Sequence, residues 1–224
     1  MSGTTTRAGL ADPKVAAVLA ELHRDARQDL RKAVPVLPRL LIGRLRGRSL
    51  MRAITPSMVR RLYLPVSRRD GELLYALARG TGARRIVEFG TSFGISTIYL
   101  AAAARDNGGR VVTTEIEAAK CRAAEANLGR AGLADVVDVR EGDALETLRA
   151  VEGPIDLVFL DGWKDLYLPV LDVLLPAMRP GAMVAADNVN FTDARPYLDR
   201  VRGGDGFVSA VLPGGRMELS WYTP

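Results

Sequence analysis

Short apolar runs alternate with amphipathic stretches along residues 70–224. The runs have the length of buried strands, and the stretches between them have the three- and four-residue apolar spacing of helices. The predicted strands are 85–89, 110–115, 136–141, 155–161 and 183–187. The predicted helices are 70–79, 94–104, 117–131, 143–151, 166–178 and 192–201. This alternation predicts an α/β fold with a mostly parallel sheet covered on both faces.

The two ends of the chain depart from this alternation. Two short apolar runs, 207–212 and 217–222, flank Pro213, Gly214 and Gly215, which predicts an antiparallel hairpin and a total of seven strands. Near the other end, residues 12–32 have the apolar spacing of an amphipathic helix, and prolines follow them. We therefore expect residues 1–65 to form a basic helical extension, a lid or a dimer contact, and residues 66–224 to form one α/β domain.

Charge separates the same two parts. Residues 1–69 contain 15 basic and 4 acidic side chains, a net charge of +11, whereas residues 70–224 have a net charge of −6. A basic N-terminal segment could attract phosphates, nucleic acid or an acidic partner. It could equally be a solvated face of a chain that has 27 arginines and only 4 lysines.

Histidine and cysteine are nearly absent from this chain. His23 is the only histidine and Cys121 the only cysteine, so serine–histidine hydrolysis and histidine-based zinc sites lose their usual side chains. No apolar run reaches the roughly 18 residues of a membrane span, and the first residues do not resemble a signal peptide. We therefore expect a cytoplasmic protein without a membrane anchor.

A glycine-rich turn follows the first predicted strand. Glu88 ends that strand, and Gly90 and Gly94 let the backbone turn tightly before a helix whose first turn contains Ser96. Glu115 ends the second strand, where an acid can bind ribose hydroxyls. Asp143 and Ala144 follow the third strand, where they could face an adenine, although Asp143 could also cap a helix. These features suit either NAD or S-adenosylmethionine.

Polar side chains also follow the fourth and fifth strands. Asp161 ends one strand, and Asp187 and Asn188 end the other. Two carboxylates and an amide oxygen are hard ligands that suit Mg²⁺. The alternative for each residue alone is a helix cap or a solvent-facing side chain. Lys164 lies three residues after Asp161, where its amine could take a proton from a hydroxyl whose oxyanion the cation stabilises.

These residues resemble the cation-dependent O-methyltransferases of the catechol and caffeoyl-CoA group. The segments that carry the resemblance are Phe159 to Pro169, Ala186 to Val189, Ile86 to Leu100 and the stretch from Val66 to Gly71. The resemblance implies a Rossmann-like class I methyltransferase fold over residues 66–224, S-adenosylmethionine and Mg²⁺ or another divalent cation as cofactors, and a homodimer.

The resemblance also implies a role for each matching residue. Lys164 would be the catalytic base, and Asn188 would position the acceptor oxygen. Asp161, Asp187 and Asn188 would bind the metal. The cofactor-binding residues would be Val66, Glu88, Gly90, Ser96, Glu115, Asp143, Ala144, Asp161 and Trp163.

Some positions depart from the catechol enzymes. Gly162 stands where they have a histidine, and Ser92 and Ile95 replace tyrosines of their glycine loop. The chain from Phe207 onward is shorter than theirs and lacks the loop that supplies a second acidic contact to the catechol. The chemistry is therefore better predicted than the acceptor.

The leading hypothesis is methyl transfer to a small aromatic acceptor with neighbouring hydroxyl groups. Some members of the group methylate hydroxyuridine in tRNA, and the basic N-terminal segment makes nucleic acid the weaker alternative. A non-catalytic protein with the same fold, and an NAD-dependent dehydrogenase, are further alternatives. The intact set of metal ligands with Lys164 argues against the first, and the spacing of Gly90 and Gly94 argues against the second.

Overall fold

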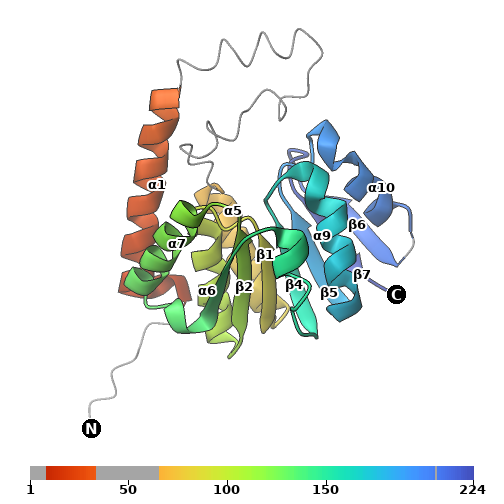
Figure 1. Ribbon diagram of the computed structural model, residues 1–224, viewed down its shortest axis with the longest axis horizontal. Coiled ribbons are helices and arrows are strands. Elements are labelled where there is room, and N and C mark those ends of the chain that lie inside the picture. Colours follow the sequence, from red (N-terminus) through yellow and green to blue (C-terminus); the bar gives the residue numbers. More distant parts are fainter. Residues whose placement is uncertain (1–8, 34–65, 205) are drawn as a thin grey trace.

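The computed structural model describes residues 9–33, 66–204 and 206–224. One seven-stranded sheet has the order β3-β2-β1-β4-β5-β7-β6 (Figure 1). Its strands are β1 Arg85–Phe89, β2 Arg110–Glu115, β3 Val137–Glu141, β4 Ile155–Leu160, β5 Met178–Ala186, β6 Phe207–Val211 and β7 Glu218–Tyr222. Strands β1 to β5 are parallel, and β7 pairs antiparallel with both β5 and β6. The predicted α/β sheet with a closing antiparallel hairpin is confirmed.

Helices cover both faces of this sheet. The first face packs against α5, α6 and α7, with α1 outside α6 and α7, and the second face packs against α8, α9 and α10. The bounds are α1 Pro13–Ala33, α5 Arg68–Gly80, α6 Ile95–Asp106, α7 Ala118–Ala131, α8 Ala144–Thr147, α9 Tyr167–Leu174 and α10 Arg195–Arg202. In the described parts of the chain, no helix is long and apolar enough to cross a membrane.

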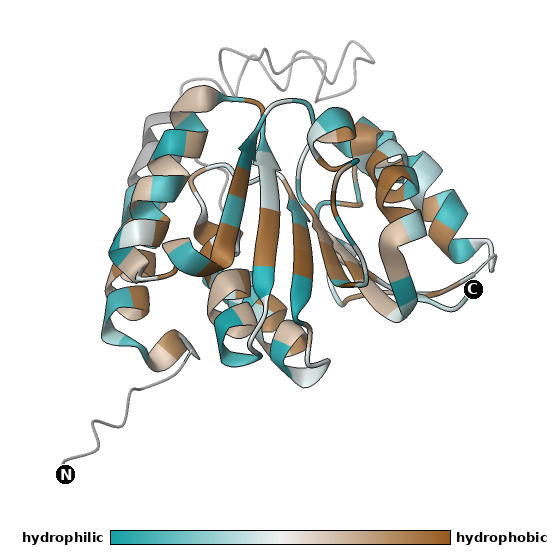
Figure 2. Ribbon diagram, turned by 60° about the horizontal axis from the view of Figure 1, so that its bottom comes forward, coloured by the Kyte–Doolittle hydropathy of each residue, from teal (hydrophilic) through white to brown (hydrophobic). Residues whose placement is uncertain are grey.

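Alternate residues of the central strands supply the two cores. In β1, Ile86 packs with the helices of the first face and Val87 with those of the second. In β4, Phe159 packs with the helices of the first face and Leu160 with those of the second. Figure 2 shows the resulting apolar band across the middle of the sheet. Because both faces are buried, polar chemistry is confined to the strand ends.

The strand register brings three of those ends together. Phe89 lies opposite Leu160, and Leu160 lies opposite Ala186. The next residue of each strand therefore lies at the same edge of the sheet. Two hydrogen bonds continue the ladder one step further, from Asp161 N to Phe89 O and from Asp187 N to Leu160 O, each 2.9 Å long.

Strand β5 begins five residues before its predicted start. Pro180 and Gly181 are typical of a turn, so the sequence predicts a strand only from Met183. In the structure Met178 already pairs with Ile155, and the register shifts before Met183 pairs with Leu157. Gly181 has a φ of +79° within this irregularity. A bulge tolerates proline and glycine where a regular ladder does not, which explains the wrong boundary.

Two predicted helices are shorter than their apolar patterns suggest. The helix predicted over 143–151 spans only Ala144–Thr147, and Arg140 Nη1 donates a 2.7 Å hydrogen bond to Thr147 O. The helix predicted over 166–178 divides into 3-10 turns at Lys164–Leu166 and Leu175–Ala177 on either side of α9. Short 3-10 turns are frequent at the ends of α-helices, which explains the turns on both sides of α9.

Helix α1 packs along α6 and α7, as Figure 1 shows. The apolar residues that predict this helix are all buried: Val15, Val18, Leu19, Leu22 and Ala26. The buried ring of His23 lies with Nε2 3.0 Å from the Tyr99 hydroxyl. Ion pairs join Arg105 to Asp12 at 3.3 Å and Arg130 to Glu21. The expectation that residues 1–65 act as a lid or dimer contact stays a prediction, since 1–8 and 34–65 lie outside the described residues.

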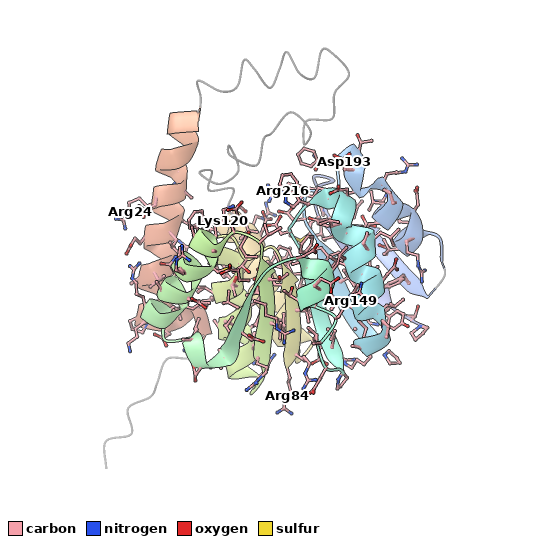
Figure 3. All side chains as sticks on the ribbon, viewed as in Figure 1. Arg24, Arg84, Lys120, Arg149, Asp193 and Arg216 are labelled. Carbon is pink, nitrogen blue, oxygen red and sulfur yellow. The ribbon has the colours of Figure 1, made fainter. Side chains whose placement is uncertain are left out.

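Replacing Leu22 with alanine tests whether α1 belongs to the core. Leu22 is 3% exposed, so Leu22→Ala should lower the free energy of unfolding by about 2–4 kcal/mol. Arg24→Ala is the control, because Arg24 is exposed and lies on the outer side of α1 (Figure 3). Urea unfolding measures both variants, and equal stabilities would contradict the packing of α1 as a structural element.

Candidate functional site

The glycine-rich turn after β1 brings the ends of β1 and β4 into close contact. Gly90 has a φ of +105°, and a Cβ there would lie 2.8 Å from the backbone of Asp161 and Gly162. Gly94 has a φ of +84° and starts α6, with Ala124 against it. Neither position accepts a larger side chain without strain. The turn therefore lies directly against the strand end that carries Asp161.

Glu88 is a fully buried acid beneath this turn. Its Oε2 accepts hydrogen bonds from the hydroxyls of Thr97 at 2.5 Å and Thr113 at 2.7 Å. Its Oε1 is buried without a hydrogen-bond partner among the described residues. Burial raises the pKa of Glu88, and neighbouring hydroxyl groups oppose this rise. A buried oxygen without a partner is costly unless a ligand supplies a donor.

The acids after β2 and β3 are both engaged with the backbone. The carboxylate of Glu115 accepts hydrogen bonds from Ser92 N and Glu117 N, each 3.0 Å long. Asp143 is exposed and caps α8, accepting a 2.8 Å hydrogen bond from Leu145 N. The capping role of Asp143, one of its two predicted roles, is thus observed.

The remaining predicted cofactor residues lie around the same edge. Ser96 is in the first turn of α6, and Ala144 starts α8. Val66 packs in the first core just before α5. Trp163 follows β4 and remains partly exposed. The adenine contacts predicted for Trp163 and Ala144 stay predictions.

Lys164 is 5% exposed, which is unusual for a lysine. Its Nζ donates hydrogen bonds to Tyr167 Oη at 2.8 Å and Gly162 O at 3.0 Å, and it lies 3.3 Å from Asp161 Oδ1. Tyr167 Oη in turn donates a 2.8 Å hydrogen bond to Asp187 O. Lys164 is therefore held between the ends of β4 and β5.

Asp161 is the second charged group of this cluster. Burial raises its pKa to about 7, with the positive charge of Lys164 opposing the rise and the negative charge of Asp187 adding to it. The two carboxylates are thus close enough for the charge of one to affect the other.

Asp187 is 2% exposed and has a basic partner of its own. Arg216 donates two hydrogen bonds to it, from Nε to Oδ1 at 2.9 Å and from Nη2 to Oδ2 at 3.0 Å. Asn188 follows with a φ of +56°, and its N–H donates a 2.8 Å hydrogen bond to Asp187 Oδ1. An asparagine tolerates this backbone conformation better than most residues do. Figure 3 places Arg216 at the sheet edge opposite to Arg84.

The structure brings the predicted metal and base residues to one edge of the sheet. Asp161, Lys164, Asp187 and Asn188 follow the neighbouring strands β4 and β5. Within residues 9–33, 66–204 and 206–224, no three His, Cys, Asp or Glu side chains form a group that could hold a metal ion. The candidate ligand set consists of two carboxylates and one amide. Its role stays a prediction.

Several contacts of this site have little or no signal in the sequence. Arg216 follows a hairpin turn, and Tyr167 starts α9 as one apolar residue among many. Thr97 and Thr113 look like ordinary helix and strand residues. A weak signal existed only for Tyr167, which lies three residues after Lys164 and so on the same side of a helical turn.

The raised pKa of Asp161 predicts a pH dependence of stability. The folded state favours the protonated carboxyl, so its stabilising effect is complete below the ordinary pKa near 4 and is lost as pH rises through about 7. Without divalent cations, the free energy of unfolding should fall between pH 5 and 8 by on the order of 1–3 kcal/mol from this group. Urea unfolding in EDTA at several pH values measures the slope.

Two variants assign that slope to one residue. Asp161→Asn should flatten it, because the amide does not titrate. Asp135→Asn changes an exposed acid in the same way and should keep the wild-type slope. A slope that Asp161→Asn leaves unchanged would contradict the pKa shift.

The chain is similar in sequence to known methyltransferases. Residues 87–189 match a family model described as a methyltransferase domain. A catechol O-methyltransferase of Mycobacterium tuberculosis is 42% identical over 127 residues, 56% of this chain and 57% of the relative. A catechol O-methyltransferase of Sus scrofa is 30% identical over 147 residues, 62% of this chain and 77% of the relative.

A solved structure extends the similarity to three dimensions. The O-methyltransferase TomG of Streptomyces achromogenes, involved in tomaymycin synthesis and solved with S-adenosylmethionine, is 32% identical with a TM-score of 0.65. The match covers 72% of this chain and 82% of TomG. The chain spans less than three fifths of the length of the M. tuberculosis relative. By sequence and by fold, the chain belongs to the class I O-methyltransferases related to the catechol O-methyltransferases.

Proposed function

We propose that the protein transfers the methyl group of S-adenosylmethionine to a hydroxyl of a small aromatic acceptor that carries two neighbouring hydroxyls. One observation carries this proposal. The amine of Lys164, almost wholly buried, lies between Asp161 and the end of β5. The glycine turn beside it lies over Glu88, which has one buried oxygen without a hydrogen-bond partner among the described residues. A base, two acids and a candidate cofactor turn thus share one edge of the sheet.

The residues around the turn fit S-adenosylmethionine. The ammonium group of its methionine part could donate to Glu88 Oε1, which has no partner among the described residues. Glu115 is a hydrogen-bond acceptor at the end of β2, where ribose hydroxyls bind in related folds. Val66, Gly90 and Ser96 would border the methionine part, and Asp143, Ala144, Asp161 and Trp163 the adenosine part. The cofactor supplies an electrophilic methyl group on a sulfonium.

The donor chemistry of Asp161, Asp187 and Asn188 fits a divalent cation. All three offer hard oxygen atoms, which Mg²⁺ prefers. Burial raises the pKa of Asp161, and a bound cation would favour its ionised form. Such an ion supplies positive charge that lowers the pKa of a nearby hydroxyl. Asn188, the third residue of this set, would position the acceptor oxygen.

Lys164 would accept the proton of the acceptor hydroxyl at Nζ as a neutral amine, after its ammonium form has released one of its three protons to solvent. Its three hydrogen-bond partners fix the amine beside the acids, which supports proximity and orientation as the main contribution of the protein. Tyr167 would act as a positioning residue, since its hydroxyl bridges Lys164 and the backbone of Asp187. The resulting oxyanion would attack the methyl carbon as its bond to sulfur breaks.

A methyl-transfer screen tests the proposed activity. With labelled S-adenosylmethionine and Mg²⁺, catechols should accept the labelled methyl group. Monohydroxy analogues should accept at least tenfold less (roughly 1.4 kcal/mol per tenfold), because they lack the second hydroxyl that would help to bind and orient the acceptor. EDTA should abolish transfer and added Mg²⁺ restore it. Caffeoyl thioesters and tRNA belong in the same screen. Methyl transfer that survives chelation would contradict the proposed need for a divalent cation. Methyl transfer to tRNA alone would contradict the proposed small aromatic acceptor.

Two variants separate the base from the cofactor site. Lys164→Met should lower turnover by about 10²–10⁴-fold and leave the affinity for S-adenosylmethionine nearly unchanged. Glu88→Gln should weaken that affinity by about 10–100-fold, because a charge-assisted hydrogen bond is lost. Calorimetry measures the affinities and the methyl-transfer assay the rates. Full turnover in Lys164→Met would refute its role as base.

A further inference from the structure

Arg216 contacts Asp187 in the geometry of a paired ion. It follows the β6–β7 turn, 29 residues from Asp187 in the sequence, and its Nε and Nη2 bond the two carboxylate oxygens at 2.9 and 3.0 Å. A planar guanidinium matches a carboxylate at both oxygens, which makes such pairs stronger than single contacts. The same carboxylate belongs to the proposed metal set.

The guanidinium has a second acidic partner at the start of α5. Arg216 Nη2 also donates a 2.8 Å hydrogen bond to Asp70 Oδ2. Asp70 is tied to Ser67 by reciprocal hydrogen bonds, from Ser67 Oγ to Asp70 Oδ2 at 2.7 Å and from Asp70 N to Ser67 Oγ at 3.1 Å. Arg216 thus has an anchor that does not depend on Asp187.

The backbone of Arg216 is fixed while its side chain is accessible. Val189 N donates a 2.9 Å hydrogen bond to Arg216 O, which holds the residue beside the end of β5. The side chain of Arg216 is 44% exposed, whereas that of Asp187 is 3% exposed. A side-chain movement toward Asp70 and solvent would therefore release Asp187 without disturbing the core.

The guanidinium and a divalent cation need the same negative charge. Both would lie against Asp187, and two cations on one buried carboxylate repel each other strongly where water is scarce. Asp161 has Lys164 as its basic partner, and Asp187 has Arg216. Each acid of the proposed metal set is therefore paired with a basic side chain of the chain itself.

We infer that Arg216 is an internal cation that competes with the divalent metal for Asp187 and so lowers the affinity of the metal site. This inference rests on the proposed function, because it takes Asp187 as a metal ligand. Without metal, Arg216 neutralises the buried carboxylate. When metal binds, the guanidinium leaves Asp187 and stays with Asp70. With such a competitor, the apparent dissociation constant of the metal equals the intrinsic constant divided by the fraction of molecules in which the site is free.

Mn²⁺ titration of the metal-depleted, full-length protein tests this inference. Calorimetry or the electron paramagnetic resonance signal of free Mn²⁺ gives the dissociation constant. If the site is free in about one molecule in ten, Arg216→Gln should bind Mn²⁺ about tenfold more tightly than the wild type. Arg216→Lys keeps the charge but loses the two-pronged contact, so its affinity should lie between the two.

A distant arginine provides the control. Arg84→Gln removes the same charge at the opposite edge of the sheet (Figure 3), and its Mn²⁺ affinity should equal that of the wild type. Thermal unfolding adds a second readout. Without metal, Arg216→Gln should unfold at a lower temperature than Arg84→Gln, and saturating Mn²⁺ should raise its unfolding temperature by more. If Arg216→Gln does not fold, the Mn²⁺ affinity and unfolding temperature of Arg216→Lys are compared with those of the wild type and Arg84→Gln instead.

The possible failures are distinguishable. Equal Mn²⁺ affinity in the wild type and both Arg216 variants would overturn the competition and leave the metal site standing. Weaker binding in Arg216→Gln would also overturn it, since Arg216 would then support the metal. Absence of Mn²⁺ binding in all four proteins would refute both the metal site and this inference.

Discussion

Burial of the parallel sheet on both faces is the constraint on which the site depends. Because helices cover both sides of β1, β4 and β5, polar side chains of these strands have room only at the ends. The register then aligns three ends, so that Gly90, Asp161 and Asp187 follow residues that lie directly opposite one another. Gly90 and Asp187, which are 97 positions apart in the sequence, thereby lie on either side of the strand end that carries Asp161. The glycine turn and the acidic cluster are two results of this one alignment.

Concentrating acids at one edge creates an electrostatic problem that the chain solves locally. Burial raises the pKa of Asp161, and the negative charge of Asp187 adds to the rise. Lys164 and Arg216 each compensate one acid, and Tyr167 connects the lysine to the end of β5. Glu88 differs, because it keeps one buried oxygen without a partner among the described residues. A site of this kind is more stable with its ligands than without them.

Helix α1 shows that the basic N-terminal segment is not wholly separate from the α/β domain. Helix α1 buries its apolar face on α6 and α7, and His23 contacts Tyr99 in that interface. The amphipathic spacing in the sequence predicted the helix but not the surface that it covers. Its charged face remains available to solvent, as at Arg24. Eight of the 15 basic residues in the first 69 positions lie in 1–8 and 34–65, outside the described residues, so the role of this net charge stays a prediction.

The sequence by itself determined the order of the elements and the strand ends that carry Asp161 and Asp187, because apolar periodicity and strand-end acids are local signals. It set the bounds of β1 and β2 correctly. Only the tertiary structure decided the early start of β5, where a bulge accommodates Pro180. It alone decided the pairing of Arg216 with Asp187, since a long side chain reaches its partner across a hairpin that no sequence spacing encodes. Periodicity reports which face of an element is buried, whereas side-chain partners depend on distances set by the whole fold.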